Sequence, residues 1–125
     1  MNGLTLDTGA LIAVDRGSGR ITALLRRAVE EGITLTVPAA AVAQAWRDGS
    51  RQARLSRLLS AAQTEVVAMD HSMARAVGAI CGRAAVDDVV DVSVVVCARE
   101  RNDKIVTSDA GDLRRIDPEV PLIIL

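Results

Sequence analysis

Short apolar runs alternate along this chain with longer segments in which apolar side chains recur at helical spacing. Strands are expected over residues 4–6, 33–37, 65–68, 104–107 and 122–125, and helices over 8–15, 18–31, 38–46, 50–62, 70–84 and 88–101. Strands separated by helices pair in parallel, and a parallel sheet needs helices on both of its faces. The pattern therefore predicts an α/β fold, with a three-layer α/β/α arrangement around a central parallel sheet.

One domain is expected over residues 1–125, because no repeat, low-complexity tract or linker-like segment divides the chain. Half of the residues are apolar, which excludes intrinsic disorder. The longest nearly apolar stretch, residues 33–46, is too short to cross a bilayer, and the N-terminus carries no secretory signal. Cys81 and Cys97 are isolated, which argues against a disulfide framework or a cysteine zinc site. We expect a cytoplasmic protein that does not associate with membranes.

Charge is unevenly distributed along the chain. Residues 1–86 carry ten basic and seven acidic side chains, whereas residues 87–125 carry five basic and nine acidic ones. Trp46 is the only aromatic residue, so stacking of bases on aromatic platforms is not the expected way of binding a nucleic acid. Arginines, which outnumber lysine fourteen to one, can bind phosphate groups instead. An acidic cluster beside a basic surface is the first indication of function.

The acidic residues lie where a parallel sheet presents its ligands. Asp7 follows the first expected strand and Asp109 follows the fourth. If these strands are neighbours, both carboxylates meet at the carboxyl ends of the strands, where open α/β sheets bind ligands. Asp88 and Asp91 lie three residues apart and therefore on one face of the helix expected over 88–101.

Each of these carboxylates also has an ordinary structural explanation. Asp87 and Asp88 can cap the helix that follows them, and Asp7 and Asp109 can be turn residues. Asp91 is harder to explain in this way, because valines flank it on both sides in an otherwise apolar helix. A carboxylate that is buried or half-buried there needs a partner.

A divalent cation is the partner that the sequence favours. No Lys or Arg lies close in sequence to Asp7 or Asp91, so converging carboxylates would repel one another. Ligands that are all oxygen atoms favour Mg²⁺ or Mn²⁺ over zinc, and the usual chemistry of such a site is phosphodiester hydrolysis. No Ser-His-Asp or Cys-His system competes with it, since the single His71 is expected to be an exposed helix residue.

Three segments, in this order, resemble the PIN-domain ribonucleases and, within them, the VapC toxins of bacterial type II toxin–antitoxin pairs. They are Leu4–Ala13 (LTLDTGALIA), Val90–Val92 (VDV) with its apolar helix, and Val106–Asp109 (VTSD) followed by Asp112. The resemblance covers nearly the whole chain and implies a metal-dependent endoribonuclease that leaves 3′-hydroxyl and 5′-phosphate ends. It also implies that Asp7, Asp91 and Asp109 are catalytic and bind Mg²⁺ or Mn²⁺.

The same resemblance implies two kinds of partner, an RNA substrate and a VapB-like antitoxin that plugs the cleft and represses transcription. Gly78 and Gly82 have a spacing that favours a close helix–helix contact. We therefore also expect a homodimer.

The chain departs from the family pattern at one position. The family usually has a Glu on the helix after the second strand, whereas this chain has Gln44 there. A neutral side chain would weaken binding at a second metal position, for which Asp88 or Asp112 could compensate. Thr8 and Ser108 are further candidates, as hydroxyl contacts to the ligands or the phosphate. The alternative function is a catalytically weakened PIN-like domain that binds RNA or a protein.

Arg47, Arg51, Arg54 and Arg57 recur every three or four residues, which predicts one basic stripe on a helix. Such a stripe is either an ordinary solvated face or a surface that follows the phosphates of RNA.

Two other families share part of the pattern. The segment LDTGA at residues 6–10 also resembles the active-site turn of retroviral-type aspartic peptidases, but those are all-β proteins and this chain has strong helical periodicity. Phosphoacceptor receiver domains match in length and α/β pattern. They resemble this chain less well, because they expect an acidic pair after the first strand, where Asp7 stands alone.

Overall fold

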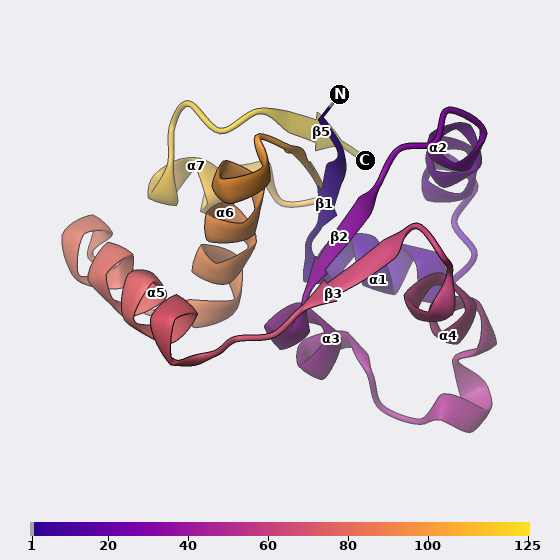
Figure 1. Ribbon diagram of the computed structural model, residues 1–125, viewed down its shortest axis with the longest axis horizontal. Coiled ribbons are helices and arrows are strands. Elements are labelled where there is room, and N and C mark those ends of the chain that lie inside the picture. The colour runs from indigo at the N-terminus through magenta and orange to yellow at the C-terminus, as the bar shows by residue number, and fades with distance from the viewer. Residues whose placement is uncertain (1) are drawn as a thin grey trace.

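The structure is a computed structural model that describes residues 2–125 (Figure 1). Its strands are β1 (Leu4–Leu6), β2 (Leu35–Pro38), β3 (Thr64–Val67), β4 (Lys104–Thr107) and β5 (Leu122–Ile124). Its α-helices are α1 (Thr8–Asp15), α2 (Gly19–Glu30), α3 (Ala39–Ala45), α4 (Ala53–Ser60), α5 (His71–Ala84), α6 (Val89–Arg101) and α7 (Ala110–Ile116), and a 3₁₀ turn covers Gly49–Arg51. The elements alternate along the chain as the sequence predicts.

All five strands pair in parallel, in the order β3-β2-β1-β4-β5. The chain builds the sheet outward from β1 to β3, and then returns to add β4 and β5 on the other side of β1. The order reverses between β1 and β4, which is the position where open parallel sheets bind their ligands. The condition stated in the sequence analysis, that β1 and β4 are neighbours, is met.

Helices cover both faces of the sheet, so the three-layer α/β/α prediction is also confirmed (Figure 1). On one face, α1 contacts α2 and α4. On the other face, α6 lies against β1, β2 and β4 and is flanked by α5 and α7. Each face of the sheet therefore has its own apolar core. None of the helices in residues 2–125 is long and apolar enough to span a membrane.

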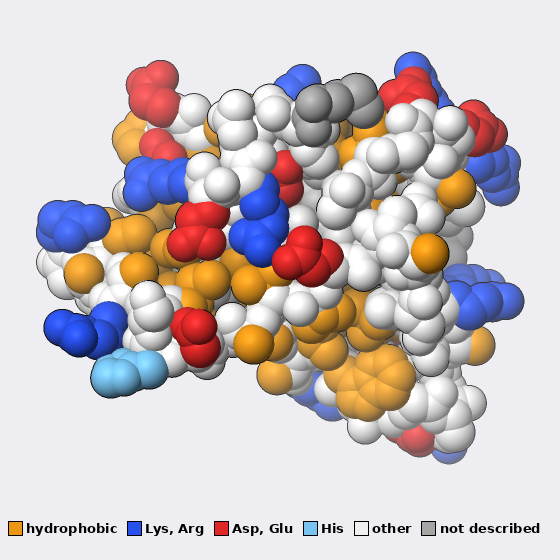
Figure 2. Space-filling view, viewed as in Figure 1, with side chains coloured by type: hydrophobic (Ala, Val, Ile, Leu, Met, Phe, Trp, Pro, Cys, Tyr) orange, Lys and Arg blue, Asp and Glu red, His pale blue; other side chains and the backbone are white. Residues whose placement is uncertain are grey.

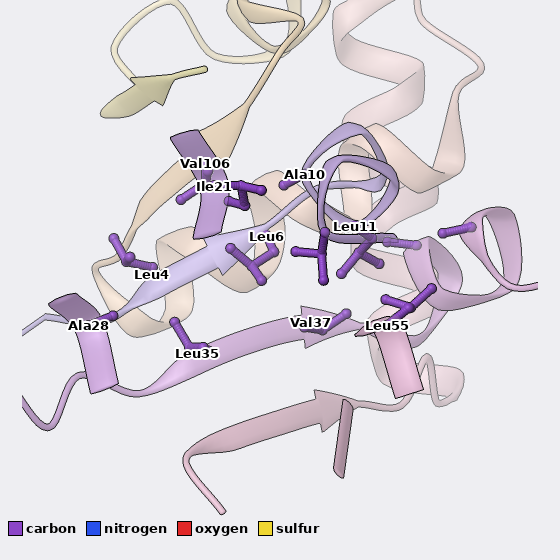
Figure 3. Packing of buried hydrophobic residues seen from close by; sticks show 13 residues of the cluster. Leu4, Leu6, Ala10, Leu11, Ile21, Ala28, Leu35, Val37, Leu55 and Val106 are labelled. Atoms are coloured by element: carbon purple, nitrogen blue, oxygen red, sulfur yellow. The ribbon is translucent and has the colours of Figure 1, made fainter. Parts of the chain in front are cut away.

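The core under α1 depends on the two-residue alternation of the strands. Leu4 and Leu6 of β1 and Leu35 and Val37 of β2 form one cluster with residues of the covering helices, such as Leu11 of α1 and Ala28 of α2 (Figure 3). Leu6, Leu11 and Val37 are fully buried. Burial of each such side chain stabilises the fold by about 2 kcal/mol. This packing holds α1 against the sheet directly after Asp7.

The core on the opposite face is centred on α6. A helix that is apolar all round must be enclosed, and Val92, Val94, Val95 and Cys97 are all buried between the sheet and the helices α5 and α7. The valine run of the sequence therefore has a packing role. It also places the start of α6, which carries Asp91, beside the carboxyl ends of the strands.

The side chain of Asp103 joins β1 to β4 at the amino ends of the strands, opposite the ends that Asp7 and Asp109 follow. Its Oδ1 accepts a hydrogen bond from Gly3 N at 2.8 Å, and its Oδ2 accepts one from Thr5 Oγ1 at 2.9 Å. Asp103 is buried, so both bonds are shielded from water. Sequence reasoning did not single out this residue, because its partners lie about a hundred residues away.

The structure differs from the predicted elements at three places. The helix expected over 50–62 begins only at Ala53, because the Gln52 side chain holds the preceding loop by accepting from Arg47 N and Asp48 N and donating to the Ala45 carbonyl. Pro38 ends β2 and does not lie in the first turn of a helix. Helix α7 was not predicted, because only Leu113 and Ile116 are buried in its seven residues and no periodic pattern can be recognised.

The close helix–helix contact expected from Gly78 and Gly82 is not present in residues 2–125. Both glycines are exposed on α5, and a Cβ atom at either position would meet nothing within 4 Å. Helix α5 instead packs through its other side, where Met73 and Val77 are buried.

Candidate active site

Asp7 is held rigidly at the end of β1. Its Oδ1 accepts a hydrogen bond from Ala10 N at 2.8 Å, so the side chain caps α1 as well as facing the carboxyl edge of the sheet. The side chain is buried, and this burial raises its pKa above the ordinary value. The Thr107 hydroxyl and the amides of Ala10 and Gly9 act against this rise, whereas the Asp109 charge adds to it.

Asp109 approaches Asp7 from the adjacent strand. It follows β4, and its backbone N donates to Thr107 Oγ1 at 2.8 Å. Because β1 pairs with β4, the two carboxylates meet where the strand order reverses. The sequence-based expectation that Asp7 and Asp109 converge is therefore confirmed.

Gly9 allows α1 to begin this close to the end of β4. A Cβ atom at Gly9 would lie 2.5 Å from Ser108 Oγ and 3.5 Å from Asp7 Oδ1. Ser108, a predicted site residue, therefore lies directly against the first turn of α1. Any larger residue at position 9 would have to displace it.

Asp91 lies in the first turn of α6, in the midst of other carboxylates. Its pKa is raised to about 7, first by burial and then by the charges of Asp88, Asp112 and Asp7. Asp88 caps α6, since its Oδ1 accepts from Asp91 N at 3.0 Å, and this confirms the structural explanation given for it. Capping does not remove Asp88 from the site, because its charge and its hydrogen bond with Asp91 both raise the pKa of Asp91.

Asp112, on α7, completes the cluster of acidic residues. A hydrogen bond with Asp109 and the Asp109 charge raise the pKa of Asp112, while Arg115 lowers it. A hollow of about 290 Å³ opens between α6 and α7, lined by Asp87, Asp88, Asp91, Asp112 and Arg115 among others. Asp88, Asp91 and Asp112 thus face solvent-accessible space that a ligand can enter.

Gln44 lies at the edge of the same site. Thr8 Oγ1 donates a hydrogen bond of 2.6 Å to Gln44 Oε1, which links the residue after Asp7 to helix α3. The bond places Gln44 beside Thr8, the residue that follows Asp7. It uses one of the two lone pairs of Gln44 Oε1, so the oxygen can accept a second hydrogen bond.

Within the described part of the chain, no Lys or Arg side chain neutralises the acidic cluster by an ion pair. In residues 2–125, none of Asp7, Asp88, Asp91, Asp109 and Asp112 forms an ion pair. Nor do any three His, Cys, Asp or Glu side chains in this part of the chain stand close enough together to hold one metal ion as they are. The carboxylates share one edge of the sheet without forming a closed set of ligands.

The family model of the PIN domain matches residues 4–118. The chain belongs to the PIN domain family. No curated protein matches it in a comparison of sequences.

The fold of this PIN domain is similar to those of three solved structures. VapBC2 from Rickettsia felis, bound to a DNA fragment from its promoter, matches with a TM-score of 0.70 and 16% identity, over 98% of this chain and 98% of that one. FitAB bound to the IR36 DNA fragment matches with a TM-score of 0.66 and 16% identity, over 97% of this chain and 94% of that one. FitAcB from Neisseria gonorrhoeae matches with a TM-score of 0.64 and 18% identity, over 96% of both chains.

The four arginines expected on one helical stripe of the PIN domain are not on one helix. Arg47 lies in the loop after α3, where it donates to the carbonyls of Ala43 and Trp46. Arg51 belongs to the 3₁₀ turn and lies 3.8 Å from Asp48, while Arg54 and Arg57 are on α4. The prediction of one stripe was wrong, because the buried Gln52 side chain stabilises a loop between α3 and α4.

Two residues of the site were missed in the sequence. Thr107 contacts Asp7 and accepts from the backbone of Asp109, so it links the two carboxylates. Arg115 faces the acidic hollow from α7. The position of Thr107 at the end of a strand, two residues before Asp109, was a usable signal. No signal in the sequence indicated Arg115, because helix α7 was not predicted.

Proposed function

We propose that this PIN domain is a Mg²⁺- or Mn²⁺-dependent endoribonuclease and the toxin of a type II toxin–antitoxin pair. The observation that carries the proposal is the convergence of Asp7, Asp91 and Asp109 from three separate elements. Two of these groups, Asp7 and Asp91, experience burial and neighbouring negative charge, which raise their pKa values. A dication bound between them would relieve that repulsion.

The chemistry of the donor set fits such a cation. Every candidate ligand is a carboxylate, which suits Mg²⁺ or Mn²⁺ and not a thiolate- or imidazole-binding metal. Asp7, Asp91 and Asp109 would hold it, and Asp88 and Asp112 are available as further ligands. Asp109 and Asp112 are exposed and can rotate, whereas Asp7 is held by its bond to Ala10. When bound, the metal would supply an activated water and stabilise charge on the phosphate.

The other side chains have positioning roles in this proposal. Thr107 sets the distance between the ends of β1 and β4 by contacting Asp7 and the Asp109 backbone. Thr8 holds Gln44 through the 2.6 Å bond, which leaves the amide nitrogen and one lone pair of Gln44 Oε1 available to orient a water or a phosphate. Ser108 offers a hydroxyl beside Asp7 that can contact the phosphate of the substrate.

The proposed partners are suggested by the structural relatives. The VapBC2 and FitAB structures are bound to DNA, and their chains share this fold over almost their full length. We therefore propose a VapB-like antitoxin as the partner of this chain, and a homodimer as its own assembly. The substrate is RNA, recognised through phosphate contacts and strand shape, since the chain has no aromatic residue other than Trp46.

The test is incubation of the purified protein with single-stranded RNA and Mg²⁺ or Mn²⁺, beside Asp7→Asn. Cleavage that requires the metal and is lost in Asp7→Asn supports the proposal. Absence of cleavage by the wild type under both metals would contradict it.

A second candidate function is a PIN-like module that binds RNA or protein but has lost cleavage, and Gln44 favours it. Gln44→Glu would restore a carboxylate beside Thr8 and is expected to increase cleavage at low Mg²⁺. Equal activity of Gln44→Glu and wild type across a Mg²⁺ titration would remove Gln44 as a reason for weakened metal binding. RNA binding without cleavage by the wild type, with cleavage gained in Gln44→Glu, would favour the binding module.

A further inference from the structure

A second hollow begins at the same edge of the sheet and extends along the opposite face. It has a volume of about 470 Å³, and its lining includes Gly9, Ile12, Arg16, Arg20, Ser108 and Leu125. The hollow lined by Asp88, Asp91 and Asp112 lies between α6 and α7. The second hollow lies along α1 and is here called the arginine groove. Gly9 and Ser108 belong to both the groove and the immediate surroundings of Asp7. The groove is therefore continuous with the candidate active site.

Two arginines stand at the far end of the groove. Arg16 follows the last residue of α1, and Arg20 lies in the first turn of α2. Both are exposed, and no carboxylate in residues 2–125 lies within 4 Å of either guanidinium group. Arg20 is nevertheless held in place, since its Nη2 donates to the Ile124 carbonyl at 3.3 Å. Its other N–H groups remain available to bind a ligand.

Some other arginines of the domain are neutralised by carboxylates of their own. On the face of the molecule that carries β3 and α5, basic and acidic side chains lie next to one another (Figure 2). Arg101 there lies 3.2 Å from Glu65, and Arg99 lies 3.0 Å from Asp117. These cations are neutralised by their own partners. The charge of Arg16 and Arg20 is not, so the groove attracts anions.

The spacing between the arginines and the carboxylates suits a polyanion. Helix α1 rises about 1.5 Å per residue, so Arg16 lies about 10 Å along its axis from Gly9. A single phosphate could not reach from the carboxylates to Arg16, whereas a strand that carries several phosphates could. The wall between them is formed by Gly9, Ile12 and Ala13, and the uncharged polar side chains of the lining are Ser18 and Ser108. The charged contacts that the groove offers are therefore suited to the phosphates of a strand.

We propose that the arginine groove binds the RNA strand flanking the scissile phosphate, with Arg16 and Arg20 contacting its backbone phosphates. This rests on the proposed nuclease function, because the strand would enter the groove from the acidic edge. An acidic segment of a protein partner would also be attracted by two arginines. RNA is favoured because the groove ends at Gly9 and Ser108 beside Asp7, where the proposed cleavage would take place, and because a strand carries phosphates along the length that separates Asp7 from Arg16.

The test measures binding separately from cleavage. A fluorescent single-stranded RNA is titrated with protein in EDTA, at several salt concentrations, for wild type and Arg16→Gln/Arg20→Gln. We expect the double variant to bind at least about tenfold more weakly, since each charge-assisted bond to a phosphate contributes substantially. The slope of log affinity against log salt should fall by about 1.4, because each of the two phosphates that the variant no longer neutralises accounts for about 0.7.

Two controls isolate the groove. Arg75→Gln/Arg83→Gln removes the same charge from the exposed surface of α5, and is expected to leave affinity and salt slope near the wild-type values. Arg16→Lys/Arg20→Lys keeps the charge and should retain most of the salt slope. An equal loss of affinity in the α5 variant, an unchanged slope in the groove variant, or no RNA binding by the wild type would each overturn the proposal.

A cleavage assay in Mg²⁺ distinguishes this proposal from the nuclease function. If wild type cleaves RNA, Arg16→Gln/Arg20→Gln should raise KM and leave kcat nearly unchanged, because flanking contacts are made equally before and during the reaction. If wild type binds RNA through the groove but does not cleave it, the groove stands and the nuclease function fails. Tighter arginine-dependent binding of a polyglutamate peptide than of RNA would reject RNA as the occupant.

Discussion

Leu6 of β1 lies opposite Val106 of β4 in a parallel pairing, so the two strands end side by side and deliver Asp7 and Asp109 to the same point. The pairing continues one step further, where Asp7 N donates to the Val106 carbonyl at 3.3 Å. The site is thus built at the ends of two interior strands of the sheet. A site on rigid elements can keep its carboxylates close together in spite of their repulsion.

The first prediction concerns the stability of Asp91→Asn at different pH values. The pKa of Asp91 is about 7 in the folded chain, against an ordinary value of 3.8. Stability associated with this group is therefore present below its unfolded pKa and is lost as the pH rises through about 7. Asp91→Asn cannot ionise, so its melting temperature relative to wild type should increase from acidic to mildly alkaline pH without divalent cations. Thermal unfolding across this range measures it. A difference that does not change with pH would contradict the assignment.

The second prediction concerns added metal. Mg²⁺ or Mn²⁺ that binds only the folded chain should stabilise wild type, by about 2.7 kcal/mol at a hundred times the dissociation constant. Asp7→Asn and Asp91→Asn should lose most of this stabilisation, because each removes a charged ligand. Asp48→Asn, which changes an exposed carboxylate beside the 3₁₀ turn, serves as the control. Equal metal-induced shifts of the melting temperature in all four proteins would mean that the ion binds elsewhere.

The third prediction concerns the contact between Gly9 and Ser108. In Gly9→Ala, a Cβ atom 2.5 Å from Ser108 Oγ forces the Ser108 hydroxyl to rotate away from α1. If this hydroxyl helps to position Asp109, a proposed metal ligand, its displacement should lower RNA cleavage severalfold.

Gly78→Ala is the matched control for that substitution, because a Cβ atom there meets nothing within 4 Å. It should leave cleavage unchanged and stabilise the domain by about 0.5–1 kcal/mol, since alanine restricts the unfolded chain. Cleavage by Gly9→Ala at the wild-type rate would mean that Ser108 does not help to position Asp109.

The fourth prediction concerns Asp103, which joins β1 to β4. Asp103→Ala leaves the Gly3 amide and the Thr5 hydroxyl without their acceptor and should destabilise the domain by about 3 kcal/mol. Urea unfolding measures the change. Asp48→Ala also removes two hydrogen bonds, both to Ser50, but in an exposed loop, and it should destabilise the domain much less than Asp103→Ala. Similar losses of stability in the two variants would show that burial of Asp103 is not what makes its bonds strong.

Much of the fold could be predicted from local patterns. The strand Leu4–Leu6 and the valine-rich helix α6 both appear where the spacing of their apolar residues indicated. The expectation that Asp7 and Asp109 would converge needed only one further assumption, that β1 and β4 are neighbours. These features depend on alternation, helical periodicity and capping, which are properties of residues close together in the sequence.

Other features depend on contacts between residues far apart, and periodicity did not reveal them. Gln52 interrupts what reads as one arginine-bearing helix, and α7 forms because Leu113 and Ile116 find a core made by α5 and α6. By itself, the sequence determined which residues form strands and helices and which carboxylates follow them, because those preferences are local. Only the tertiary structure decided the strand order, the raised pKa of Asp91 and the groove that holds Arg16 and Arg20 near Ser108. Burial and electrostatic repulsion arise only when distant segments are packed together.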